Sequence, residues 1–243
     1  MIIYTTITKD DCPLPIQTIK TNYECVCFHS VDIKEKQTFW NYQKIRLIEE
    51  NPLLTQRSYK LLSHKYIQED SCYFDPKNLI INIPTPTKDF LINRHPFKKN
   101  MLDELKDWYL LPAITMLQGK EILQYFNRKK YDFSLNHIGM IGNVIYRKYT
   151  RKNIKHNNIW FSIFKKFKIR DQLPFYLSSF LSKLDIEYSD KVYAITPEHQ
   201  PYTWNNKDLY LNNLTHLTEF IKLLKQYNST YTLNQNLLDF RLK

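Results

Sequence analysis

Glycine is scarce in this sequence: three glycines occur among 243 residues, at Gly119, Gly139 and Gly142. The P-loop and the G-x-G-x-x-G dinucleotide loop both need several glycines, so that backbone N–H groups can approach a phosphate. Neither loop fits into this sequence. A nucleotide bound by this chain would therefore have to be held mainly by side chains.

Long apolar runs and cysteine pairs are also missing. No segment approaches about 18 consecutive apolar residues, so we expect no membrane-spanning helix. Residues 1–7 lack a basic region followed by a long apolar run and are typical of a first strand, not of a signal peptide. There is no C-x-x-C pair, and the C-x-C spacing places Cys25 and Cys27 on one face of a strand. We expect a cytoplasmic protein, in the host cytoplasm if the source is a virus, with its four cysteines reduced.

Positive charge is abundant. The chain carries 35 Lys and Arg against 24 Asp and Glu, for a net charge of +11. This balance favours polyanionic partners such as nucleic acid, an anionic membrane face or phosphorylated glycans. An AT-rich genome, which enriches Lys, Asn, Ile and Tyr, is the alternative explanation, and composition leaves both open.

The stretch 71–81 reads as a strand, one carboxylate, a turn and a second strand. Tyr73 and Phe74 favour a strand, and Pro76 and Asn78 are turn residues. Asp75 would then follow a buried strand, at the edge where open α/β sheets bind ligands. The alternative is an acidic residue that opens an ordinary turn.

Strands are predicted to alternate with helices along the chain, which indicates an α/β domain with a mixed, mostly parallel sheet flanked by helices. We find no linker and no repeat, so residues 1–243 are predicted to form one domain, with a core at 1–185 and a C-terminal strand and helices at 186–243 packed on it. Strands are expected at 2–7, 23–28, 71–74, 79–81, 91–92, 135–146 and 192–195, and helices at 40–50, 53–66, 101–128, 148–168, 175–184 and 209–227.

Two groups of basic residues stand out. Arg57, Lys60 and His64 recur at helical spacing, so we expect one face, which is either solvated or turned to a diphosphate. The segment 147–170 interleaves cations with aromatic residues at helical spacing, and Trp160, Phe164 and Phe167 are expected to anchor it in the core. Its cations are Arg147, Lys148, Arg151, Lys152, Lys155, Lys165, Lys166, Lys168 and Arg170.

Several short motifs occur in the order found in a family of glycosyltransferases related to the GT-A type of nucleotide-sugar transferases, which residues 1–185 resemble. The matching segments are Tyr4-Thr5-Thr6-Ile7 with Asp10-Asp11, Tyr23 to Phe28, the set Arg57, Lys60 and His64, Tyr73 to Lys77, His95-Pro96-Phe97-Lys98 with Glu104, and Trp160 with Arg170-Asp171-Gln172-Leu173. The resemblance implies a GT-A-like (Rossmann-like) fold and a nucleotide-sugar donor.

The sequence departs from this family after Asp75, where Pro76-Lys77 replaces Gly-Asn. GT-A enzymes often bind Mn²⁺ or Mg²⁺ near this point through a second carboxylate, and a charged lysine cannot serve as that ligand. The resemblance implies Asp75 as a metal ligand, with His199 as a C-terminal one. The alternative for His199 is an ordinary loop histidine, so metal dependence stays open.

Site roles follow from the resemblance and from the chemistry of glycosyl transfer, which needs charge stabilisation on the leaving diphosphate and a base for the acceptor hydroxyl. Asp171 is the candidate base, unless it is only the cap of a helix, and Asp75 is the second catalytic candidate. Residues assigned to the donor and its phosphates are Thr5, Thr6, Asp11, Arg57, Lys60, His64, Lys77, Arg170 and Gln172. Residues assigned to the acceptor are His95, Glu104, Lys152, Lys155 and Lys166.

The predicted function is a hexosyl- or pentosyltransferase that acts on a polyanionic acceptor, such as hydroxymethylated bases in phage DNA. A transferase for surface polysaccharide or lipopolysaccharide is the first alternative, and a non-catalytic nucleic-acid-binding protein is the second. Sugar, nucleotide, inverting or retaining outcome and oligomeric state stay open.

Overall fold

The computed structural model describes residues 1–243 except 11, 13, 111–112, 136–139, 196–215 and 233–243. Its centre is a seven-stranded sheet with the order β3-β2-β1-β4-β7-β6-β8. The strands are β1 (Ile2–Ile7), β2 (Glu24–His29), β3 (Asn41–Lys44), β4 (Ser71–Phe74), β6 (Phe90–Arg94), β7 (Met140–Arg147) and β8 (Ile186–Ser189).

Strand β7 runs antiparallel to both of its neighbours, β4 and β6, and the other neighbouring pairs are parallel. The chain builds outward from β1 to β2 and β3 on one side, and then places β4 on the other side of β1. This reversal makes a topological switch point at the carboxyl ends of β1 and β4. The prediction of an α/β fold with a mixed, mostly parallel sheet is confirmed.

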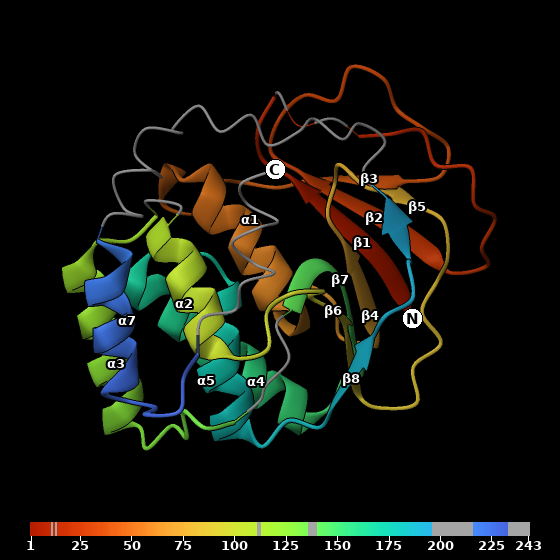
Figure 1. Ribbon diagram of the computed structural model, residues 1–243. Coiled ribbons are helices and arrows are strands. Elements are labelled where there is room, and N and C mark those ends of the chain that lie inside the picture. The colour runs from red at the N-terminus through yellow and green to blue at the C-terminus, as the bar shows by residue number, and fades with distance from the viewer. Residues whose placement is uncertain (11, 13, 111–112, 136–139, 196–215, 233–243) are drawn as a thin grey trace.

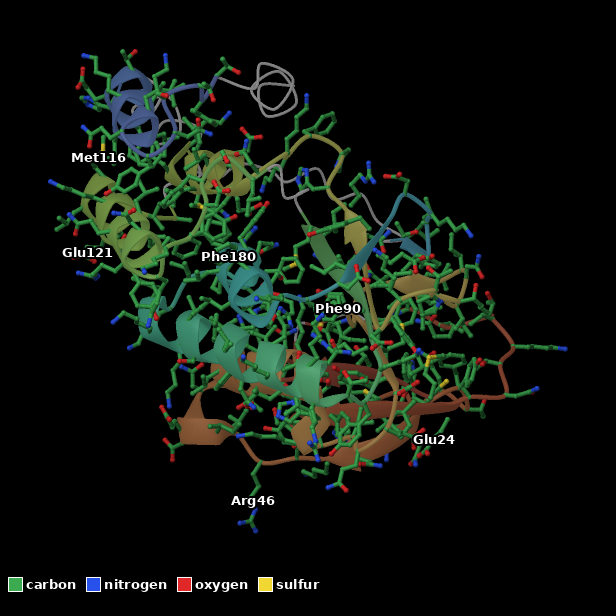
Figure 2. The ribbon with its side chains drawn as sticks, turned by 90° about the horizontal axis from the view of Figure 1, so that it is seen from below. Glu24, Arg46, Phe90, Met116, Glu121 and Phe180 are labelled. Carbon is green, nitrogen blue, oxygen red and sulfur yellow. The ribbon has the colours of Figure 1, made fainter. Side chains whose placement is uncertain are left out.

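The described helices lie on one face of this sheet, in two layers (Figure 1). Side chains of the first layer pack on the strands, with Tyr4, Tyr73, Leu61, Trp160 and Phe175 in one buried cluster. Figure 2 shows the sheet and the two helical layers in sequence across the molecule, marked by Phe90 on the sheet, Phe180 in the first layer and Met116 in the second. The first layer contains α1 (Pro52–Leu61), α4 (Arg151–Phe167) and α5 (Gln172–Ser182), and the second contains α2 (Met101–Leu110), α3 (Met116–Arg128) and α7 (Leu217–Lys225).

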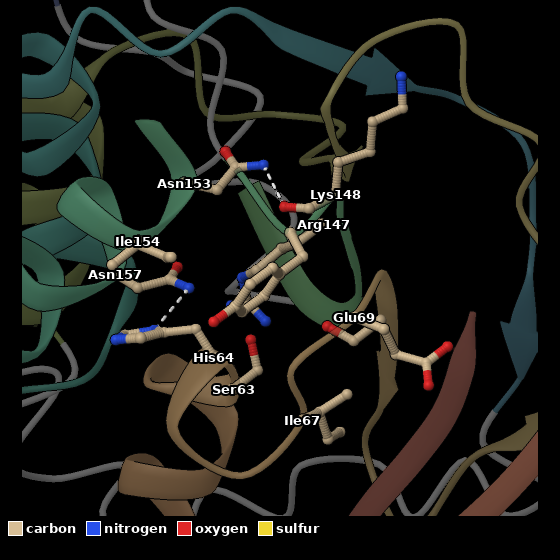
Figure 3. A pocket seen from close by; sticks show the side chains of 11 residues that line it. Ser63, His64, Ile67, Glu69, Arg147, Lys148, Asn153, Ile154 and Asn157 are labelled. Atoms are coloured by element: carbon tan, nitrogen blue, oxygen red, sulfur yellow. Dashed lines mark hydrogen bonds between the residues drawn. The ribbon is translucent and has the colours of Figure 1, made fainter. Parts of the chain in front are cut away.

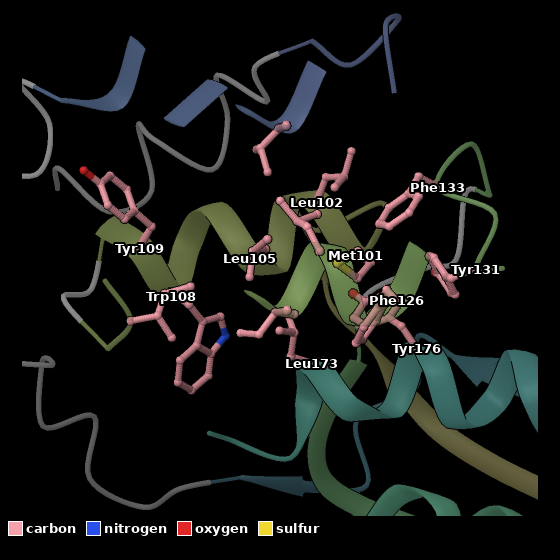
Figure 4. Close-up of a cluster of buried hydrophobic side chains, with 14 of the residues drawn as sticks. Met101, Leu102, Leu105, Trp108, Tyr109, Phe126, Tyr131, Phe133, Leu173 and Tyr176 are labelled. Carbon is pink, nitrogen blue, oxygen red and sulfur yellow. The ribbon is translucent and has the colours of Figure 1, made fainter. Parts of the chain in front are cut away.

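The second layer has its own buried cluster, which joins the helices to one another (Figure 4). Leu105 of α2, Phe126 of α3, Leu173 of α5 and Phe220 of α7 all belong to it. None of the described helices is long and apolar enough to span a membrane.

The opposite face of the sheet is covered by loops and by a two-stranded antiparallel sheet of β5 (Leu79–Ile80) and β9 (Ala194–Ile195). Ile80, Ala194 and Trp40 pack there with Cys25 and Cys27. The two cysteines thus share a face, as predicted, and all four cysteines are free thiols.

Local signals explain where the helices begin. Asn51 caps α1, because its side-chain oxygen accepts a hydrogen bond from the Leu54 N–H at 2.9 Å, and Pro52 fits the first helical position. Thr115 and Gln118 form a reciprocal capping box at the start of α3. Thr150 caps α4 through the Asn153 N–H.

Several predicted elements were wrong or had different bounds. Residues 40–50 are not a helix: they form β3 and a short 3-10 helix, η1 (Ile48–Glu50). Pairing with β2 satisfies the backbone of 41–44, and Trp40 is buried against the opposite face of the sheet, so tertiary contacts outweigh local propensity there.

The other differences are smaller. The helix predicted for 53–66 ends at Leu61 and is followed by a separate 3-10 helix, η2 (Ser63–Lys65). Strand β8 was missed, and β9 is shorter than predicted. Of the helix predicted for 209–227, residues 209–215 lie outside the described part, and α7 begins at Leu217.

Candidate active site at the carboxyl ends of the central strands

A buried ion cluster lies beside the switch point. The Asp171 carboxylate is 2.6 Å from Nζ of Lys60 and 3.4 Å from Nε of Arg57. The side chains of Lys60 and Asp171 are only 4% and 1% exposed, while Arg57 keeps 16% of its side chain exposed. The cluster thus has an inner pair and one cation that still reaches solvent.

Two hydrogen bonds hold the partners of this cluster in place. The Tyr4 hydroxyl of β1 donates to the Tyr59 carbonyl at 3.2 Å, which fixes α1 on the sheet. The indole N–H of Trp160 donates to the Asp171 carbonyl at 2.6 Å, which fixes the residue before α5. The Tyr4–Tyr59 bond spans 55 residues of sequence, and the ion pairs themselves join α1 to Asp171, so tertiary structure creates the cluster.

The charges of the cluster shift one another's pKa. Burial would raise the pKa of Asp171, but Arg57 and Lys60 outweigh it and hold the pKa well below its usual range. Burial lowers the pKa of Lys60, although the carboxylates of Asp171 and Asp75 oppose this effect. For Arg57, burial is outweighed by Asp171, Tyr73 and Asp75, and its pKa is raised. Asp171 is therefore a strongly held anion.

Asp75 directly follows β4, as predicted, and lies near the cluster. Its backbone N–H donates to the Asn143 carbonyl at 2.8 Å, and it is half-buried. Its carboxylate raises the pKa of Arg57 and opposes the lowering of the pKa of Lys60. Asn143, its backbone partner, follows Gly142, which borders Lys60 and Asp171, so Asp75 lies close to the cluster. Asp75 is the more accessible of the two carboxylates at this site.

Gly142 of β7 makes room for the cluster. A Cβ atom at this position would lie 2.9 Å from Nζ of Lys60 and 3.4 Å from Oδ2 of Asp171. Any larger residue would push the ammonium away from its partner. Gly142 was not among the predicted site residues, although glycine is scarce in this sequence and each glycine was therefore a candidate for such a position.

The polar side chains of β1 divide between the two faces of the sheet. Thr6 lies on the same face of β1 as Tyr4, toward the helices. Thr5 lies on the same face as Ile3 and Ile7, toward the loops. Both threonine hydroxyls are buried without a hydrogen-bond partner among the described residues, and so is the Tyr73 hydroxyl. Thr6 and Tyr73 are on the face that carries the ion cluster.

The prediction that His64 shares a face with Arg57 and Lys60 was wrong. α1 ends at Leu61, and His64 belongs to η2. Its ring lies 3.4 Å from the Asn157 amide, close to Arg147 at the other end of β7. His64 and Asp75 therefore lie at opposite ends of the strands.

The helix-cap alternative for Asp171 does not hold, because Asp171 precedes α5 but its side chain makes no capping hydrogen bond. Gln172 is the first residue of that helix and is half-buried. Arg170 is exposed, with its guanidinium 4.9 Å from the centre of the Trp108 ring. Lys77 is exposed in the turn after β4.

The residues assigned to the acceptor are spread over several elements. Glu104 is fully buried, where its Oε1 accepts from Nζ of Lys98 at 2.9 Å and from Nε1 of Trp108 at 2.6 Å. His95 accepts hydrogen bonds from the backbone N–H groups of Phe97 and Lys98, both at 3.2 Å. These contacts order the start of α2, and the acceptor roles stay predictions.

A metal site is not assembled within the described residues. They contain no group of three or more His, Cys, Asp and Glu side chains that could hold a metal ion. Asp75 supplies one carboxylate, and Asp11 and His199 lie outside the described residues. Arg57 and Lys60 supply the positive charge next to Asp171.

The outer face of α4 is basic. Trp160 and Phe164 are buried and Phe167 packs against the helical core, so the predicted anchoring is confirmed. Arg147 is the exception, because it is buried in β7 and does not belong to the surface. The exposed cations of the segment are Lys148, Arg151, Lys152, Lys155, Lys165, Lys166, Lys168 and Arg170.

Some of these cations already have partners. Lys148 pairs with Asp89 at 3.1 Å and Lys165 with Glu49 at 2.9 Å. Arg151, Lys152 and Lys155 form no salt bridge within the described part of the chain. The first turns of α4 thus present cations that are open to an anionic partner.

Comparison with known proteins adds no family: no family model and no curated protein matches this chain.

Proposed function

We propose that this chain is a glycosyltransferase that uses a nucleotide-sugar donor. The observation that carries the proposal is the meeting of Arg57, Lys60, Asp75 and Asp171 at the carboxyl ends of β1 and β4. Open α/β sheets bind nucleotides at such switch points. Residues that the motif resemblance assigned to donor binding and catalysis meet there from distant parts of the sequence, which supports a common role.

The chemistry required is charge stabilisation. When the bond between the sugar and the diphosphate breaks, negative charge grows on the leaving phosphate, and fixed cations in a dry site stabilise it. Arg57, which keeps some exposure, would contact the diphosphate, and Lys60 would add its charge from behind. Because the diphosphate is held by side chains, this site needs no glycine-rich loop.

The two aspartates differ in role in this proposal. Asp171 is buried and ionised between two cations, so it is a weak base, and we assign it to positioning Arg57 and Lys60. This assignment replaces the general-base role that the motifs suggested. Asp75 is more accessible and is our candidate for direct contact with the substrate.

The test is a transfer assay over a panel of nucleotide sugars, with hydroxymethylated DNA and glycolipid as acceptors and the mass shift as readout. Asp75→Asn should fold normally and lower turnover at least about a hundredfold. Asp32→Asn, at a carboxylate that is 94% exposed, is the control and should not change turnover. Turnover of Asp75→Asn within about threefold of wild type would remove Asp75 from the site. If no nucleoside diphosphate binds in calorimetry, the donor proposal fails.

For the acceptor, we propose a polyanion, with DNA that carries hydroxymethylated bases as the first candidate. α4 begins after β7, at the end of the strands that is remote from Asp75. It then runs toward Asp171, at the end of the strands that carries the proposed active site. At a rise of about 1.5 Å per residue, its exposed lysines Lys152 and Lys166 are about 20 Å apart along the axis. A row of that length suits a phosphate backbone.

The length of this row of lysines allows a test that distinguishes DNA from a small acceptor. Neutralising Lys152 and Lys155, which are remote from Asp171, should raise the apparent KM for DNA and flatten its salt dependence by about one unit per lost phosphate contact. Donor affinity should not change. Lys222→Gln with Lys225→Gln on α7 is the matched control, because both lysines are exposed on another helix.

The outcomes distinguish the remaining alternatives. DNA binding that is absent at low salt, or unchanged in the Lys152/Lys155 variant, would refute the nucleic-acid acceptor and favour a surface glycan. DNA binding without binding of any nucleotide sugar would favour a non-catalytic nucleic-acid-binding protein. A DNA acceptor would also require the base to be reached in the groove or flipped out of the duplex.

A further inference from the structure

A buried arginine lies at the opposite end of the strands from the proposed active site. Arg147, the last residue of β7, is 2% exposed. Its Nη1 donates to the Tyr4 hydroxyl at 3.4 Å, and its guanidinium lies 5.5 Å and 5.7 Å from the ring centres of Phe90 and Trp160. It forms no salt bridge with a carboxylate in the described part of the chain.

These contacts leave most of the guanidinium unsatisfied. Nε and Nη2 of Arg147 are buried and have no hydrogen-bond partner among the described residues. An arginine stays charged in proteins, and burying a charge without a partner is strongly unfavourable. The aromatic rings offset part of this cost, but they accept no conventional hydrogen bond from Nε or Nη2. The guanidinium thus lacks an anionic acceptor.

A cavity of about 10 Å³ lies next to this guanidinium, which is room for one water molecule or one monatomic ion. Figure 3 shows Arg147 reaching from β7 toward Ser63, with His64 and Asn157 next to each other beside it. Ser63 can supply a hydroxyl, and Asn157 can supply an amide N–H in addition to the contact of its Nδ2 with Nδ1 of His64 at 3.4 Å. The cavity therefore combines one fixed positive charge with donors, and its lining residues Asn153 and Asn157 also carry buried Oδ1 atoms without a partner among the described residues.

The acidic residue at this cavity is already engaged. Glu69 lines the cavity, but its carboxylate pairs with the N-terminal ammonium group at 3.0 Å, and Figure 3 shows it directed away from the guanidinium. The local field is positive: burial first, and then Lys65 and Arg147, lower the pKa of His64. An anion in the cavity would meet cations and donors.

We propose that this cavity binds one small inorganic anion of the size of chloride, with Arg147 as its charge partner and Asn157 as a hydrogen-bond donor. The anion supplies the acceptor that Nε and Nη2 of Arg147 lack. The site is separate from the Asp171 cluster and does not depend on the proposed glycosyl transfer. Its role is to stabilise the packing of β7, η2 and α4, because all three elements line it.

The test is thermal unfolding in sodium chloride against sodium gluconate at equal ionic strength, because gluconate is too large for the cavity. Wild type should gain about 5 °C or more in Tm at a hundredfold excess of chloride over its Kd, and the gain should saturate. Arg147→Met should lose the chloride-specific gain. Arg151→Met, at an exposed arginine four residues away, should keep it.

Two further measurements keep the proposal testable if Arg147→Met does not fold. Asn157→Leu, which keeps the charge but removes a donor, should raise the chloride concentration at half-maximal gain several-fold. Crystals of the wild type soaked in bromide should show an anomalous peak beside the Arg147 guanidinium. A Tm that is equal in chloride and gluconate, together with no bromide peak, would overturn the proposal and leave a water molecule in the cavity.

Discussion

The stability of this protein should depend strongly on Asp171, and two ion pairs with similar geometry allow a controlled test. Nζ of Lys60 is 2.6 Å from Asp171, and Nζ of Lys88 is 2.7 Å from Asp185. The first pair is almost fully buried, whereas the side chains of Lys88 and Asp185 are 42% and 69% exposed. The perturbations to compare are Asp171→Asn and Asp185→Asn.

The expected magnitudes follow from burial. Removing one partner of a buried pair costs about 3 to 5 kcal/mol, because the remaining charge is left without compensation. Here two cations, Lys60 and Arg57, lose their shared anion. An exposed pair is worth about 0 to 1 kcal/mol. For a chain of this size, Asp171→Asn should therefore lower Tm by roughly 6 to 20 °C, and Asp185→Asn by a few degrees at most.

The pH dependence gives a second readout with a defined sign. The pKa of Asp171 is lower in the folded protein than in the unfolded chain. Its contribution is therefore complete above about pH 4 and is lost as the pH falls through the folded-state pKa. The difference between wild type and Asp171→Asn should shrink in strong acid.

The assay is urea unfolding followed by circular dichroism, with Tm from calorimetry. Adding Lys60→Met to Asp171→Asn should recover part of the loss, because it removes one of the uncompensated cations. A loss for Asp171→Asn of less than about 1 kcal/mol, equal to that of Asp185→Asn, would refute the reasoning that this cluster is a buried, coupled unit.

Three further predictions concern the site and the core. Gly142→Ala should lower the free energy of unfolding by about 1 to 3 kcal/mol and lower activity, because its Cβ would lie 2.9 Å from Nζ of Lys60. In a Lys60→Met background, urea unfolding should show a smaller loss for Gly142→Ala, and an equal loss would contradict the steric cause. Transfer activity should depend only partly on Mn²⁺ or Mg²⁺ when it is assayed with and without a chelator; complete, reversible loss would indicate a full metal site that includes residues such as His199. Burial, and then Arg147, lowers the pKa of His156 to about 3. Below about pH 6.5 the unfolded chain therefore takes up a proton that the folded protein does not. Between this pH and the folded-state pKa, the free energy of unfolding should fall by about 1.4 kcal/mol for each pH unit of acidification. His156→Gln should remove this part of the slope in urea unfolding measured from pH 7 to pH 4, and an unchanged slope would show that other groups cause it.

The strand ends of the core were predictable from sequence. The run Cys72-Tyr73-Phe74 followed by Asp75 and Pro76 marks the end of β4, because apolar strand formers give way to a turn. The fold class followed from the alternation of such strands with helical segments. In contrast, β3 was predicted as helix, because this short edge strand has one tyrosine among three polar residues and carries no periodic signal of its own.

The site shows the same division. Helical spacing placed Arg57 and Lys60 on one face correctly, but it also extended that face to His64, because nothing in the spacing marks the end of α1 at Leu61. Spacing likewise counted Arg147 among the surface cations of α4. The structure puts it in a strand, buried beneath two aromatic rings.

The sequence by itself determined the local features: the turn after β4, the helical spacing of Arg57 and Lys60, and the basic outer face of α4. Each of these depends on residues that are neighbours in the chain or one helical turn apart. Only the tertiary structure decided that Asp171 meets Lys60 and Arg57, that Gly142 leaves room for them, and that Arg147 is buried without a carboxylate partner. The physical reason is that burial and pairing of charges depend on contacts between distant segments, and these contacts set the free energy of a charge far more than its neighbours in sequence do.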